Sequence, residues 1–92
     1  MNKCLKIILT VEAKNEFLHN VIQRNARKFG LEGLAQTLGK DKIKIIVCGE
    51  RDHVDHFVDF IHKESPKENI EDIEIEPFLK DKDYRGVFRV IE

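Results

Sequence analysis

The sequence has few cysteines and no long apolar run, the features that are typical of secreted, metal-binding and membrane-bound proteins. Its 92 residues include two cysteines, Cys4 and Cys48, which lack a CxxC spacing and are too few for a disulfide framework. Two thiols in such a chain favour a reducing compartment, and we expect both to be free. No apolar run approaches the roughly 20 residues of a membrane-spanning helix, and the N-terminus lacks the cleavage site of a signal peptide. We therefore expect a mature cytoplasmic protein that does not contact a membrane.

The sequence also lacks an excess of either charge. Its 16 lysines and arginines balance 17 acidic residues, and the formal net charge is −1. Because binding to a phosphate backbone needs a net basic face, we do not expect nucleic acid as a partner. The hydrophobic share of 41% suffices for one core, and chains split into several cores only above roughly 250 residues. We expect a single monomeric domain over residues 1–92.

Alternating apolar residues predict strands, and apolar residues spaced three and four apart predict helices. Gly30 is the expected left-handed cap of the first helix, and Asp52 is the expected N-cap of the second. Ser65–Pro66 is the expected end of the second helix, because proline cannot continue the hydrogen-bond ladder. We expect strands at residues 4–12, 31–38, 42–48, 70–76 and 87–91, and helices at residues 16–29 and 52–64.

This order of elements predicts an α+β fold, a two-layer α/β sandwich with two helices on one face of a mainly antiparallel sheet. Connection rules favour the ferredoxin-like split βαβ arrangement (βαββαβ plus a C-terminal strand), with the third strand between the first and the second. That register sets Cys4 opposite Cys48 on the outward face. A strained disulfide between the two strands is the alternative there to the two free thiols that we expect. The apolar pairs that fix the register are Leu5 with Val47, Ile7 with Ile45, and Leu9 with Ile43.

Residues 30–49, GLEGLAQTLGKDKIKIIVCG, resemble the acylphosphatase family. That family has a segment G-L-x-G-W-V-x-N, a short turn, and an alternating strand that ends in glycine. Ser65–Pro66 with Ile70, and YRGVFRV at residues 84–90, resemble later parts of the same family, so the resemblance covers nearly the whole chain. The residues at matching spacings in the first segment are Gly30, Leu31, Gly33, Gln36, Ile43 and Gly49.

The resemblance implies hydrolysis of a carboxyl-phosphate anhydride to a carboxylate and phosphate. Such a site needs backbone N–H groups and a fixed cation for the phosphate, and a polar group that holds the attacking water in line. In the family, the motif V-Q-G-V-x-F-R supplies the first two and corresponds here to residues 13–19. The anion-binding residues that this implies are Lys14, Asn15, Glu16, Phe17, Leu18 and His19.

Two positions depart from the family in their chemistry. His19 stands where the family has arginine, and Thr37 stands where it has the water-orienting asparagine. Arginine supplies a permanent charge and a planar fork of donors, whereas a histidine side chain with an ordinary pKa of about 6.5 is mostly neutral at pH 7. The carboxylate of Glu16 would also repel a phosphate dianion. We therefore assign no residue a catalytic role, and His19 and Thr37 are the family positions.

Other side chains suggest different chemistry. His53 and His56 lie among aspartates on the second helix, but histidines without a third ligand from elsewhere are typical of a solvated helix face. We expect no metal and no other cofactor. Cys48 has no histidine placed to activate it as a nucleophile. On the open face of the sheet, Ile8 and Ile46 interrupt mostly polar residues, and a purely structural scaffold is a third hypothesis.

We predict an acylphosphatase-like domain that has lost efficient hydrolysis and binds a small phosphate-like anion or a protein partner. The joint replacement at His19 and Thr37 favours this hypothesis. The alternative is a divergent but active acylphosphatase that recruits Lys14, Arg24 or Arg51 for the missing charge.

Overall fold

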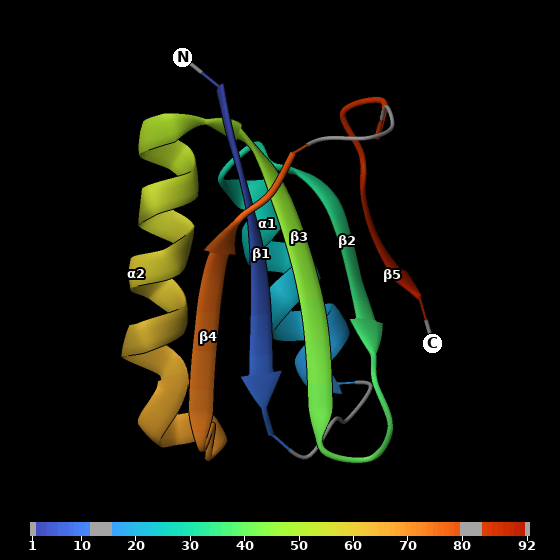
Figure 1. Cartoon of the computed structure of the whole chain (residues 1–92), viewed down its shortest axis with the longest axis vertical. Helices are drawn as coiled ribbons and strands as arrows, with labels where there is room; N and C mark the ends of the chain where they lie inside the picture. Colours follow the sequence, from blue (N-terminus) through green and yellow to red (C-terminus); the bar gives the residue numbers. More distant parts are fainter. Residues whose placement is uncertain (1, 12–15, 80–83, 92) are drawn as a thin grey trace.

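The computed structural model describes residues 2–11, 16–79 and 84–91. Within these residues, five strands form one sheet in the order β4-β1-β3-β2-β5, and the helices pack against one of its faces (Figure 1). The third strand lies between the first and the second, which confirms the predicted α+β split βαβ topology. The strands are β1 (Asn2–Thr10), β2 (Glu32–Thr37), β3 (Lys42–Glu50), β4 (Asp72–Pro77) and β5 (Phe88–Ile91).

The two central strands, β1 and β3, are antiparallel in the register that their apolar residues predict. Leu5 is opposite Val47, Ile7 opposite Ile45, and Leu9 opposite Ile43, and all six side chains are buried. A shift of either strand by one residue would turn its three side chains to the other face of the sheet, so burial fixes the register. The edge strand β4 pairs antiparallel with β1, and β5 pairs parallel with β2.

The first helix differs from the regular α-helix predicted over residues 16–29. It consists of a π-helix, η1 (Phe17–Gln23), that continues into an α-helix, α1 (Arg24–Lys28). Its end is as predicted, because Gly30 has φ 71°. The N–H of Gly30 donates to the carbonyl of Arg27, and the N–H of Leu31 donates to that of Ala26. This pair of bonds is the Schellman motif that closes a helix C-terminus.

The second helix, α2 (Arg51–Glu68), is longer at both ends than predicted. Glu50 is its N-cap residue in place of Asp52, and the Glu50 side chain makes no capping hydrogen bond. Pro66 does not end the helix but lies inside its last turn, where the missing N–H removes a single bond. The helix ends instead at Asn69, whose φ of 56° is the left-handed conformation that asparagine tolerates best after glycine.

Apolar side chains gather on both faces of the sheet. The main core lies between the sheet and the helices, and its largest fully buried side chains include Phe57 and Phe88. A smaller cluster lies on the opposite, open face and consists of Leu34, Ile46 and Cys48, with Cys4, Phe78 and Tyr84 packed against them. Here the prediction of free thiols is wrong, because Cys4 and Cys48 form a disulfide bond between β1 and β3. Two cysteines directly opposite each other across neighbouring strands are close enough to be bridged.

Candidate functional site

The predicted anion-binding segment is described from Glu16 onward; Lys14 and Asn15 lie outside the described residues. Phe17 and Leu18 are buried, with exposures of 6% and 1%, and belong to the main core. Their side chains therefore anchor the start of η1 on the sheet and are not available to a ligand. Glu16 and His19 are exposed on the other side of the same turn.

His19 interacts with its own helix. Its Nδ1 lies 3.3 Å from Oε1 of Gln23, one turn further along η1. The amide of Gln23 in turn donates to the carbonyl of Phe88 at 3.5 Å, and Nη2 of Arg27 donates to the same carbonyl at 3.4 Å. These bonds connect the exposed face of the first helix to β5. Sequence reasoning did not identify Gln23, although a spacing of four residues from His19 on a predicted helix indicates such a pair.

Thr37 is the last residue of β2, and it faces the helices. It is opposite Ile43, which is fully buried in the main core, and cross-strand partners lie on the same face of a sheet. The π-helix η1 packs against β2 on this face (Figure 1). The structure thus places the strand that ends at Thr37 against the helix that carries His19.

The two described arginines considered as replacements for the missing charge lie in different places. Arg51 begins α2, directly after β3. Thr37 is opposite Ile43 near the other end of β3, and the stretch from Ile43 to Glu50 spans roughly 23 Å at about 3.3 Å per residue. Arg51 therefore cannot reach the end of β2. Arg24 is exposed at the start of α1, on the same continuous helix as His19.

Residues 2–11, 16–79 and 84–91 contain no group of three or more histidine, cysteine, aspartate or glutamate side chains placed to hold a metal ion. His53 lies 4.0 Å from a carboxylate oxygen of Glu50, a contact within one helix turn. None of the helices in those ranges has the length and apolarity needed to cross a membrane.

Fold and site together define a small split βαβ domain whose first helix packs against β2. The acylphosphatase family model matches residues 15–90. The chain belongs to the acylphosphatase family.

Individual relatives show the same likeness over most of the chain. An acylphosphatase from Methanococcoides burtonii is 26% identical over 72 residues, which are 78% of this chain and 75% of that protein. The solved structure of an acylphosphatase from Coxiella burnetii superposes with a TM-score of 0.82 at 20% identity, over 98% of this chain and 93% of that one. An acylphosphatase from Bacillus subtilis gives a TM-score of 0.82 at 18% identity over the whole of both chains. These likenesses confirm the family resemblance that the glycine and strand spacings indicate.

Proposed function

We propose that this chain is an acylphosphatase-fold domain with weak or lost acyl-phosphate hydrolysis that binds a small phosphate-like anion next to the start of η1. The observation that carries the proposal is the exposed imidazole of His19, which contacts Gln23 at the arginine position of the family. An imidazole lacks the permanent charge and the five N–H donors with which a guanidinium grips phosphate oxygens.

Thr37 supports the same conclusion from the other side of the site. It lies at the end of β2 and faces the helices, so its position suits a group that orients water. A threonine hydroxyl nevertheless sits closer to the backbone than an asparagine amide, and it has a single O–H donor where the amide has two N–H donors. The hydroxyl of Thr37 reaches less far than the family's asparagine amide, and His19 lacks the charge of the family's arginine. Together these two differences would weaken catalysis more than binding, because catalysis depends on stabilising the transition state.

The second candidate function is a divergent, active acylphosphatase. Arg24 favours it, since this arginine is exposed on the helix that carries His19. In that case Arg24 would supply the positive charge that the family's arginine supplies, since this chain has His19 at that position.

Hydrolysis of benzoyl phosphate, compared with its spontaneous rate, separates the two functions. The domain with lost activity gives a rate close to the spontaneous one, and inorganic phosphate still shifts the amide resonances of residues 16–19. Turnover far above the spontaneous rate would establish the active enzyme instead, provided that His19→Ala or Arg24→Gln abolishes this turnover. If phosphate shifts no amide in this segment, the anion-binding proposal is wrong.

A further inference from the structure

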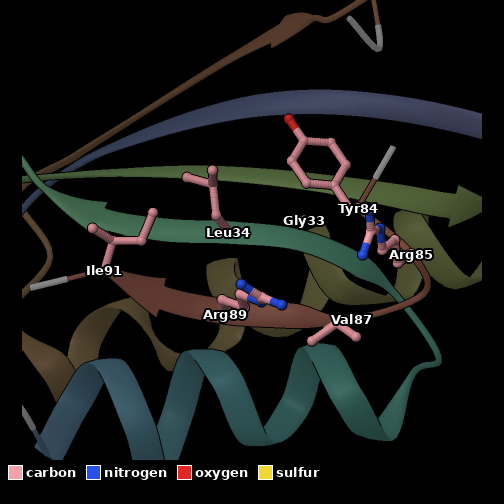
Figure 2. A pocket seen from close by; sticks show the side chains of 7 residues that line it. All are labelled: Gly33, Leu34, Tyr84, Arg85, Val87, Arg89 and Ile91. Atoms are coloured by element: carbon pink, nitrogen blue, oxygen red, sulfur yellow. The ribbon is translucent and has the colours of Figure 1, made fainter. Parts of the chain in front are cut away.

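A pocket of about 340 Å³ opens on the face of the sheet away from the helices, where the start of β2 meets β5 and the turn before it. This volume lies within the range of small-molecule binding sites, roughly 300–1,000 Å³. Figure 2 shows its side chains around β2, β5 and the preceding turn. Its lining residues are Gly33, Leu34, Tyr84, Arg85, Val87, Arg89 and Ile91.

Arg89 lines this pocket because of how β5 pairs with β2. It is opposite Leu34 in the parallel β2–β5 ladder, and Leu34 belongs to the apolar cluster of the open face. The next residue toward the turn, Phe88, is buried in the main core on the other face. Arg89 is exposed, and its guanidinium makes no hydrogen bond or ion pair with any residue that the structure describes. Its donors are therefore available to a ligand.

Arg85 adds a second guanidinium from a constrained turn. Arg85 and Gly86 have φ values of 56° and 70°, and the N–H of Val87 donates to the carbonyl of Tyr84 at 3.0 Å. Positive φ at both central positions is the type I′ turn, whose preferred residues are asparagine and glycine. A branched or long side chain is uncommon in this conformation. The turn thus presents an arginine to the pocket at a position where backbone preference favours a smaller residue.

The remainder of the lining is apolar or aromatic. Leu34 is buried with an exposure of 8%, Ile91 is exposed, and the ring of Tyr84 packs on the apolar cluster of the open face. Two arginines and no carboxylate line the pocket in the described part of the chain. A guanidinium fork pairs with a carboxylate through two parallel hydrogen bonds, and a flat ring packs favourably against aromatic and aliphatic side chains.

We propose that this pocket binds a small aromatic carboxylate, with the carboxylate held by Arg89 and Arg85 and the ring packed between Tyr84 and Leu34. The site is separate from the anion site at the start of η1. Thr37 faces the helices, whereas Leu34 and Arg89 face the opposite side of the sheet.

Titration of the ¹⁵N-labelled full chain with benzoate tests the proposal, with neutral benzamide as the probe of matched shape. Saturable amide shifts centred on residues 33–34 and 84–91, absent with benzamide, are the expected result. Equal shifts with both probes would show that the arginines do not recognise charge, and the proposal would be wrong. Benzoate shifts centred instead on residues 16–19 would place binding at the other site and would overturn it as well.

Charge-removing variants assign the recognition to the two arginines. Arg89→Gln should weaken benzoate binding at least tenfold. Arg85→Asn should also weaken it while suiting the left-handed turn, so that the fold is kept. Arg51→Gln, which removes an exposed arginine from the start of α2, is the matched control and should leave the affinity unchanged. Equal benzoate affinities in wild type and Arg89→Gln, with the amide spectrum otherwise preserved, would contradict the proposal.

Discussion

Cys4 and Cys48 stand opposite each other in the two central strands and are joined by a disulfide bond with a sequence separation of 44. The bond lies on the open face of the sheet, within the cluster that also contains Leu34 and Ile46. It links the first strand to the third, and it closes a loop that includes the whole first helix and β2.

Reduction of this bond should destabilise the fold. A cross-link that closes a loop of this length removes conformational entropy from the unfolded chain, an effect of about 4 kcal/mol in the chain-entropy model and typically 2–4 kcal/mol in practice. Urea unfolding with and without dithiothreitol measures the difference. The double variant Cys4→Ala/Cys48→Ala is the control, and its stability should not respond to the reductant. A wild-type midpoint that reductant leaves unchanged, with reduction verified by mass, would contradict this expectation.

Gly33 is a position where any side chain should be costly. Its φ is 141°, and a Cβ atom added there would overlap the backbone carbonyl of Ile46 on the neighbouring strand. Gly33→Ala must therefore move backbone atoms of the central sheet, and we expect a loss of about 3–5 kcal/mol in the free energy of unfolding. Gly39→Ala is the matched control, because Gly39 has φ 76° with open space around the added carbon. It should cost about 1–2 kcal/mol from the left-handed conformation alone. Similar losses in the two variants would refute the steric explanation.

The ion pair between β1 and α2 should titrate at low pH. Nζ of Lys3 donates to Oδ1 of Asp55 at 2.9 Å, and this hydrogen bond holds the pKa of Asp55 below its ordinary value. Because the pKa is lower in the folded state, the pair contributes stability above the ordinary pKa and loses it as pH falls through the lowered one. An NMR titration of the Asp55 carboxyl carbon should show the lowered midpoint, and Lys3→Met should raise it. Lys6→Met, which removes the neighbouring pair with Glu76, is the control and should leave the midpoint where it is. A midpoint that does not respond to Lys3→Met would show that the hydrogen bond is not its cause.

The sheet could be predicted because its register follows from burial. The residues before and after Ile7 and Ile45 in the chain face the other side of the sheet. Only the register that pairs Ile7 with Ile45 therefore buries both side chains. The π-helical start of the first helix could not be predicted in the same way. Apolar residues such as Leu18 and Ile22 are four apart, and this spacing brings them to one face in an α-helix or in a short π-helical segment alike.

The end of the second helix and the pocket beside Arg89 were harder to predict. Pro66 is a helix breaker by chemistry, yet only two residues of α2 follow it, so the lost bond and the clash of its ring affect only the end of the helix, and Asn69 provides the actual stop. For the candidate site, the family resemblance assigned His19 and Thr37 to the family positions, and their roles stay predictions. The pocket beside Arg89 was missed because it depends on β5 pairing parallel with β2, and the charged segment before β5 contains no pattern that indicates its neighbour.

Restoring the two family residues tests the central claim most directly. The measurement is the rate of benzoyl phosphate hydrolysis by wild type, His19→Arg, Thr37→Asn and the double variant under identical conditions. If the missing guanidinium limits the rate of hydrolysis, the double variant should exceed the wild type by roughly a hundredfold in kcat/KM. A single well-placed hydrogen-bond donor contributes a factor of about 10²–10³ to the catalytic rate in such sites. A wild type that already hydrolyses the substrate rapidly, and gains nothing from the arginine, would contradict the account.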